Sequence, residues 1–224
     1  MTVKEVVAAA IMAVTIFAFS NLSFLSENVP FASKERADIF SMRTLIDFGG
    51  IAKGYTGQKL AELFQEYGVS SALVSLGGNI QAIGTKPDGS SWKVGIRDPK
   101  GGQQDYIGVL SVENQAVVTS GGFERYFEED GETYIHIINP RTGYPADGDL
   151  LSVTIVSKDG TLADGMSTAL YIMGYEKACQ FWRQRREEFN VILVTDDGKI
   201  HISENLKGNF QTEWELEMIE SGSE

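Results

Sequence analysis

Residues 47–79 read DFGGIAKGYTGQKLAELFQEYGVSSALVSLGGN, which joins a glycine-rich turn to a helix and then to a strand. The helix is predicted over 55–67 by apolar residues at helical spacing: Leu60, Leu63, Phe64 and Tyr67. Gly68, which follows, is the residue type that commonly ends a helix. The apolar run 71–76 has the length of a buried strand and stops at a pair of glycines. This stretch therefore contains both kinds of element, and the rest of the chain decides how they alternate.

Outside this stretch, strands and helices follow one another without a regular order. Strands are expected at 37–47, 80–84, 92–97, 107–119 (two runs), 132–138, 151–157 and 190–201 (a strand and a hairpin). Further helices are expected at 3–18, 162–173 and 175–189. Because there is no strict βαβ alternation, the sequence predicts a single-domain α+β fold over 1–224, with a mixed sheet and packed helices. The acidic segment 213–224 is expected to be a solvated tail.

The composition is that of an ordinary globular protein of 224 residues, with 24 glycines and a net charge of −12. No stripe of Lys and Arg stands out, which argues against nucleic acid as a partner. An acidic protein that handles phosphates needs a cation, backbone N–H groups or a few placed lysines to offset repulsion. The single cysteine, Cys179, lies in a helical stretch and is expected to be a buried core residue rather than a reactive thiol.

The apolar run 6–18 has roughly the length of a signal peptide and is too short to span a bilayer. Lys4 is balanced by Glu5, so the positively charged region typical of a signal peptide is weak, and no lipobox-type cysteine follows. The run is read either as a structural helix, amphipathic or buried, or as a targeting segment.

Three glycine-rich motifs could line a ligand site. The first, Asp47 to Tyr55 with Lys53 inside it, lies at a turn that opens a helix, where backbone N–H groups favour an anion. The second, Gly77-Gly78-Asn79, ends a predicted strand, a place that commonly lines a cleft. The third, Thr119-Ser120-Gly121, offers a hydroxyl pair that could donate to a pyrophosphate. Each of the three could equally be a structural turn.

Two further motifs carry groups suited to chemistry. His136 is predicted within a strand, where its ring could act as a general base or a phosphate donor, or could be structural. Asp164, Ser167 and Thr168 stand at i, i+3 and i+4 on a predicted helix, so they share one face. All three offer oxygen atoms, which suit a hard cation such as Mg²⁺. The alternative is that Asp164 only complements a helix N-terminus.

Taken in order, DFGGIAKGY, SLGGN, VTSGG, HIINPRTGYP and ADGMSTAL resemble the signature of the ApbE family, the FAD:protein FMN transferases. The resemblance is strong over residues 40–175. It implies an enzyme that binds FAD with Mg²⁺, splits the pyrophosphate and attaches FMN to a Thr or Ser hydroxyl of an acceptor protein, with AMP leaving. Family members are typically extracytoplasmic and membrane-anchored, although this chain shows neither a lipobox nor a clear signal peptide.

Residue by residue, the resemblance implies FAD contacts at Asp47, Lys53 and Ile138, and a histidine that assists the chemistry at His136. It implies a metal site at four positions: Gly50, Asp164, Ser167 and Thr168. The glycine-rich motifs add further candidate contacts to the flavin nucleotide: Gly77, Gly78, Asn79, Thr119, Ser120 and Gly121.

The chain departs from the family in two respects. Asn139 stands where the family usually has Asp. The family also carries a long N-terminal part, with contacts to adenine and isoalloxazine, before the region that matches here, so the chain is expected to be truncated relative to the family. Two alternatives to the transferase follow: a hydrolase that turns FAD into FMN and AMP, and a non-catalytic flavin-binding remnant.

Overall fold

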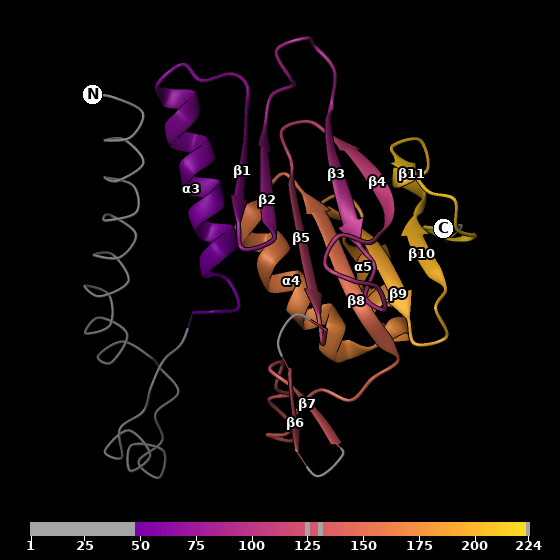
Figure 1. Cartoon of the computed structure of the whole chain (residues 1–224). Helices are drawn as coiled ribbons and strands as arrows, with labels where there is room; N and C mark the ends of the chain where they lie inside the picture. The colour runs from indigo at the N-terminus through magenta and orange to yellow at the C-terminus, as the bar shows by residue number, and fades with distance from the viewer. Residues whose placement is uncertain (1–47, 124–125, 130–131, 223–224) are drawn as a thin grey trace, which may run out of the picture. The chain divides into compact units, whose positions relative to one another are not determined.

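The computed structural model describes residues 48–123, 126–129 and 132–222 (Figure 1). The helix expected at 3–18, the strand expected at 37–47 and the candidate Asp47 lie outside these residues. The chain divides into two compact units, Met1–Gly49 and Gly50–Glu224, and every described helix and strand belongs to the second.

A seven-stranded sheet forms the centre of the second unit, with the strand order β1-β2-β5-β8-β9-β10-β12. Its strands are β1 (Ala72–Leu76), β2 (Asn79–Ile83), β5 (Ala116–Gly121), β8 (Leu150–Ser157), β9 (Phe189–Thr195), β10 (Ile200–Ser203) and β12 (Leu216–Ile219). Neighbours run antiparallel except for β10 and β12, which are parallel. The antiparallel majority, with no βαβ unit between neighbouring strands of the described residues, confirms the α+β class.

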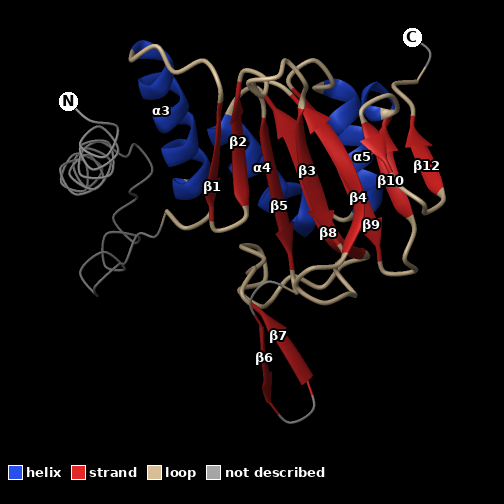
Figure 2. Cartoon of the chain, turned by 45° about the horizontal axis from the view of Figure 1, so that its top comes forward, coloured by secondary structure: helices blue, strands red, loops and turns tan. Residues whose placement is uncertain are grey.

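Three α-helices pack on one face of the large sheet: α3 (Ala52–Glu66), α4 (Gly160–Met173) and α5 (Tyr175–Gln184). A second sheet lies in front of the opposite face, as Figure 2 shows, and contains β11 (Phe210–Gln211), β4 (Tyr106–Val112) and β3 (Trp92–Arg97) in that order. A short 3-10 turn, Glu204–Leu206, and the hairpin of β6 (Tyr126–Glu129) and β7 (Glu132–Ile135) complete the unit. No helix in the described part is long and apolar enough to cross a bilayer.

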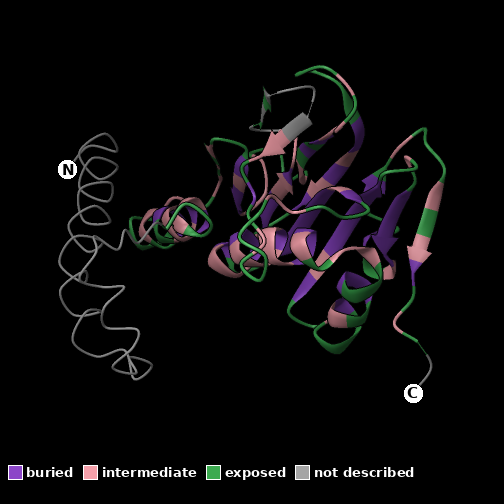
Figure 3. Ribbon diagram, turned by 90° about the horizontal axis from the view of Figure 1, so that it is seen from below, coloured by how far each residue is buried: buried purple, intermediate pink, exposed green. Residues whose placement is uncertain are grey.

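The core has two halves because the middle strands are covered on both faces (Figure 3). On β9, Val191 and Leu193 pack on the helix side, whereas Ile192 and Val194 pack toward the second sheet. A strand buried on both faces reads as a continuous apolar run rather than an alternating one. This explains why NVILVT is apolar throughout most of its length.

Several elements differ from the sequence expectation. The strand at 71–76 was expected to be buried, but β1 is the edge strand of the sheet and Leu73 is 40% exposed. Tyr67 is also exposed and lies just after α3, which ends at Glu66. Gly68 follows with a φ of 77°, the left-handed conformation that glycine readily supplies at a helix end.

The later elements also shift. The strand expected at 132–138 ends at Ile135, so His136 lies in a bend after the strand. Helix α5 ends at Gln184 rather than at 189. The segment expected to be a solvated tail contributes β12, whose Ile219 is buried in the helix-side core. In this strand apolar and charged residues alternate, which is typical of a half-buried strand, whereas the expectation of a tail rested on the acidic residues alone.

Cys179 is buried on α5, as expected, and burial raises the pKa of its thiol. Because the thiolate is the reactive form, we expect a disulfide reagent such as dithionitrobenzoate to label the native protein slowly. Unfolding in guanidinium should release one rapidly labelled thiol per chain. Labelling within the mixing time under native conditions would contradict this burial.

Candidate functional site

The SLGGN motif is a tight hairpin between β1 and β2. Leu76 pairs with Asn79 across a two-residue turn, and Gly77 and Gly78 have φ values of 55° and 93°. Positive φ at both central positions is typical of the type I′ turn that suits the twist of a hairpin. The Gly77 carbonyl accepts a hydrogen bond from Nζ of Lys53 at 3.4 Å, so the turn is joined to the first turn of α3.

Helices α3 and α4 cross in direct contact at Gly54 and Gly160. A Cβ atom placed on Gly54 would lie 2.1 Å from the Gly160 carbonyl oxygen and 2.5 Å from Cβ of Asp164. The Gly54 N–H donates to Oδ2 of Asp164 at 2.7 Å. The last glycine of the DFGGIAKG motif therefore serves a helix crossing rather than a phosphate-binding loop.

Asp164 is 4% exposed, and its carboxylate lies at the N-terminal turn of α3. The N-terminus of its own helix is already capped by Asp159, which accepts hydrogen bonds from the Thr161 and Leu162 N–H groups. Ile51, the residue before α3, makes no side-chain cap. Asp164 therefore complements the dipole of a helix about 110 residues away in the sequence, as its hydrogen bond to Gly54 shows.

Two hydroxyl groups of the same helix meet a third from the end of β5. Oγ of Ser120 lies 2.8 Å from Oγ of Ser167 and 3.1 Å from Oγ1 of Thr168. Ser167 is fully buried and donates to the backbone carbonyl of Asp164 at 2.8 Å. We call Ser120, Asp164, Ser167 and Thr168 the oxygen cluster. The three α4 residues do share a face, and the end of β5 supplies the fourth.

Thr119 and Ser120 point to opposite faces of the large sheet, because successive residues of a strand alternate. Oγ1 of Thr119 is bonded to Oγ1 of Thr154, its partner on β8, at 2.8 Å. The structure therefore separates this hydroxyl pair: Ser120 joins the oxygen cluster, whereas Thr119 faces the second sheet.

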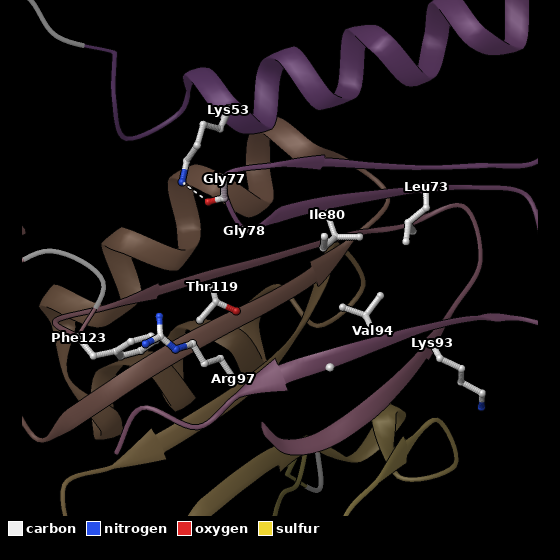
Figure 4. A pocket seen from close by; sticks show the side chains of 11 residues that line it. Lys53, Leu73, Gly77, Gly78, Ile80, Lys93, Val94, Arg97, Thr119 and Phe123 are labelled. Atoms are coloured by element: carbon white, nitrogen blue, oxygen red, sulfur yellow. Dashed lines mark hydrogen bonds between the residues drawn. The ribbon is translucent and has the colours of Figure 1, made fainter. Parts of the chain in front are cut away.

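A cavity of about 560 Å³ lies between the two sheets and is drawn in Figure 4. Its lining comes from the α3 start, the β1–β2 hairpin, β3 and the end of β5: Lys53, Leu73, Gly77, Gly78, Ile80, Lys93, Val94, Gly95, Arg97, Thr119 and Phe123. We call this cavity the inter-sheet pocket. It combines four of the sequence candidates, namely Lys53, Gly77, Gly78 and Thr119. Its volume lies in the range of small-molecule sites.

Lys53 and Gly54 connect the inter-sheet pocket to the oxygen cluster. Lys53 lines the pocket, and the next residue donates its N–H to Asp164 of the cluster. Gly50, just before α3, is exposed, and a Cβ there would meet nothing within 4 Å. Asn79 is buried at the start of β2 and does not line the pocket, and its Nδ2 has no hydrogen-bond partner among the described residues.

His136 and Ile138 lie on the segment after β7 and do not line the inter-sheet pocket. Both are exposed, Ile138 by 47%, and Ile138 forms an isolated bridge with Pro145. Asn139 begins the turn between Ile138 and Pro145: its Oδ1 accepts from the Arg141 N–H and its carbonyl accepts from the Gly143 N–H. An aspartate could make the same side-chain bond, so this departure from the family keeps the local turn.

The donor set of the oxygen cluster fits a hard cation. Among the described residues, no group of three or more His, Cys, Asp or Glu side chains could hold a metal ion. The cluster instead offers one carboxylate and hydroxyl oxygens, and Mg²⁺ in proteins commonly takes one or two carboxylates and completes its shell with substrate phosphates and waters.

Sequence reasoning missed Lys93 and Arg97 on β3, and Phe123 just after β5. WKVGIR predicts only a strand, and its two basic residues, four positions apart, were the available signal. Which of these side chains face a ligand depends on how the sheet of β11, β4 and β3 packs on the large sheet, and the sequence does not predict that packing.

Comparison with known proteins identifies the family. Residues 15–193 match the ApbE family. The chain is 41% identical over 158 residues to a FAD:protein FMN transferase of Klebsiella pneumoniae (strain 342), covering 70% of this chain and 48% of the relative. It is 46% identical over 147 residues to one of Treponema pallidum (strain Nichols), covering 62% of this chain and 41% of the relative. The chain thus spans about half the length of the curated relatives it matches.

Solved structures give the same result. The crystal structure of the ApbE protein from Thermotoga maritima superposes with a TM-score of 0.67 at 37% identity, over 73% of this chain and 53% of that one. The flavin transferase ApbE from Vibrio cholerae superposes with a TM-score of 0.63 at 31% identity, over 73% and 52%. The shared fold, and a family match over most of the chain, show that this protein belongs to the ApbE family.

Proposed function

We propose that this chain acts as a Mg²⁺-dependent FAD:protein FMN transferase, which moves FMN from FAD onto a Thr or Ser hydroxyl of an acceptor protein and releases AMP. The observation that carries the proposal is the position of the oxygen cluster. Its one carboxylate accepts the Gly54 N–H in the first turn of α3, and its α4 hydroxyls meet Ser120 at the end of β5. Lys53, next to Gly54, lines a pocket large enough for a nucleotide. The names of the relatives in the comparisons support the same activity.

In this proposal Asp164 and Thr168 would hold the cation, and Ser167 and a backbone oxygen at Gly50 would be its other protein ligands. A bound Mg²⁺ would neutralise charge that develops on the diphosphate during transfer. Ser120 would orient the α4 hydroxyls, since it is bonded to both of them. Asp47, Gly121 and Asn79 are proposed as further contacts to the nucleotide.

The protein's remaining work is to bind, orient and move one proton. Lys53 would attract a phosphate, and the hairpin glycines would let it approach the backbone. His136 would accept the proton of the acceptor hydroxyl as that oxygen bonds to the FMN phosphorus and the bond to AMP breaks. Ile138, close to it on the same segment, would contact the flavin nucleotide.

The direct test incubates the chain with FAD, Mg²⁺ and a purified flavinylation-target domain. Flavin fluorescence that stays with the target band in a denaturing gel, together with AMP release, is the expected result. FMN and AMP without a labelled target would instead identify a hydrolase. Tight FAD binding with no product would identify a flavin-binding remnant.

For His136→Ala we expect turnover to fall at least about a hundredfold while the affinity for FAD changes little, because a general base acts mainly in the transition state. Steady-state transfer rates and FAD binding by fluorescence quenching measure the two quantities separately. A loss of affinity with unchanged turnover would make His136 a contact instead of a base.

A further inference from the structure

The inter-sheet pocket is positively charged although the chain as a whole carries −12. Among the described residues, the lining includes the cationic side chains of Lys53 and Arg97 and no carboxylate. Low-dielectric walls of one charge sign concentrate a field and raise the local concentration of an oppositely charged ligand. The pocket therefore suits an anionic ligand.

Arg97 is held in one orientation at the end of β3. Its guanidinium carbon lies 4.7 Å from the centre of the Phe123 ring, a cation–π contact that also lies within the pocket lining. The β3–β4 ladder is irregular between Ile96 and Arg97, and such bulges re-aim side chains near functional sites. Within the described part of the chain, Nε of Arg97 is buried without a hydrogen-bond partner, and the guanidinium forms no ion pair.

An unpartnered guanidinium N–H in a pocket is costly unless a ligand uses it. Arginine's planar fork matches the oxygens of a phosphate. Lys93, four residues earlier on β3, differs from Arg97 because it has a hydrogen-bond partner: its Nζ is bonded to Oγ of Ser111 at 2.6 Å. Figure 4 shows the Lys93 ammonium group pointing away from the pocket.

The pocket also has two chemically different ends. Figure 4 shows Lys53, Thr119 and Arg97 together at the end near the glycine hairpin, whereas Leu73, Ile80 and Val94 lie toward the other end. A ligand with a phosphate at one end and a large ring system at the other matches this division.

We propose that Arg97 binds the phosphate of the FMN half of FAD, facing Lys53, while the flavin ring lies among Leu73, Ile80 and Val94. The inference rests on the proposed function for the identity of the ligand and adds a phosphate-binding residue to it. It makes Arg97 a binding residue, and Phe123 the residue that positions it.

The test compares FMN with riboflavin, which has the same ring and no phosphate. Affinities are measured by quenching of flavin fluorescence at a fixed Mg²⁺ concentration, without FAD or acceptor. We expect Arg97→Gln to weaken FMN binding about tenfold to a hundredfold, the usual loss for a charge-assisted hydrogen bond, and to leave riboflavin binding unchanged. Phe123→Leu keeps the charge of Arg97 but removes the ring that holds its guanidinium in place, and should weaken FMN binding about threefold to tenfold.

Lys93→Gln is the matched control, since it removes the same charge from the same strand, and its FMN affinity should stay within about twofold. Equal effects of Arg97→Gln and Lys93→Gln, or equal losses of FMN and riboflavin affinity, would overturn the proposal, as would the absence of saturable FMN binding by the native chain. A chain that binds FMN through Arg97 but labels no acceptor would contradict the transferase function and leave this inference standing.

Discussion

Asp164→Asn should abolish metal-dependent FMN transfer and leave the protein nearly as stable as before, whereas Asp164→Ala should lose both activity and stability. The reason is that one carboxylate has two roles. In the proposed site it is the only carboxylate ligand of the cation, and in the fold it accepts the buried N–H of Gly54 at 2.7 Å. Asparagine keeps an oxygen that can accept this hydrogen bond but loses the charge.

Alanine leaves the Gly54 N–H unpaired, which typically costs about 1–3 kcal/mol. For a chain of this size each kcal/mol corresponds to roughly 2–4 °C in the midpoint of thermal unfolding. Loss of the cation's charge stabilisation, worth several kcal/mol, corresponds to at least about a hundredfold in turnover for both variants. Calorimetry and transfer assays at several Mg²⁺ concentrations measure the two effects.

Asp159→Asn provides a matched control, because it removes a charge near the start of the same helix. Asparagine caps a helix about as well as aspartate, so the Thr161 and Leu162 N–H groups keep their acceptor. Stability and turnover should both stay close to the native values. If Asp164→Asn retained full activity in metal-buffered solution, Asp164 would not be a ligand and its role would be structural alone.

The sequence was sufficient wherever a local rule decided the outcome. Helical spacing alone predicted that Asp164, Ser167 and Thr168 share a face of α4. The structure confirms the helix at these positions and brings the Ser167 and Thr168 hydroxyls together at Ser120. The alternation of side chains along a strand is also a local rule, and it separates Thr119 from Ser120. Their grouping as one hydroxyl pair followed from adjacency in the sequence, which in a strand implies opposite faces.

The sequence was insufficient where distant elements meet. Nothing local shows that β3 crosses in front of the large sheet, so Arg97 and Phe123 were not recognised as neighbours. In the same way the edge position of β1 and the pairing of β12 depend on partners elsewhere in the chain. Glycine-rich motifs are ambiguous for a related reason: a missing side chain can make room for a ligand, a turn or another helix.

Gly54→Ala tests whether the glycine inside IAKGY makes room for a ligand or for another helix. Alanine normally stabilises a helix relative to glycine by about 0.5–1 kcal/mol. Here its Cβ would lie 2.1 Å from the backbone carbonyl oxygen of Gly160, so α3 and α4 would have to separate. We expect a loss of about 3 kcal/mol or more, at the upper end of overpacking costs, measured as a lower midpoint in urea or on heating.

Gly57→Ala, one turn further along α3, separates packing from propensity. That position is also buried, but its Cβ would lie 3.6 Å from the nearest atom, Cβ of Gln81, an ordinary contact. The same change should therefore leave stability unchanged or raise it slightly. Gly54→Ala should also lower transfer activity, because separating the helices moves the Gly54 N–H away from Asp164 and Lys53 away from the oxygen cluster. If both variants proved equally stable, the helix crossing would not require glycine, and the motif would be explained by ligand contact instead.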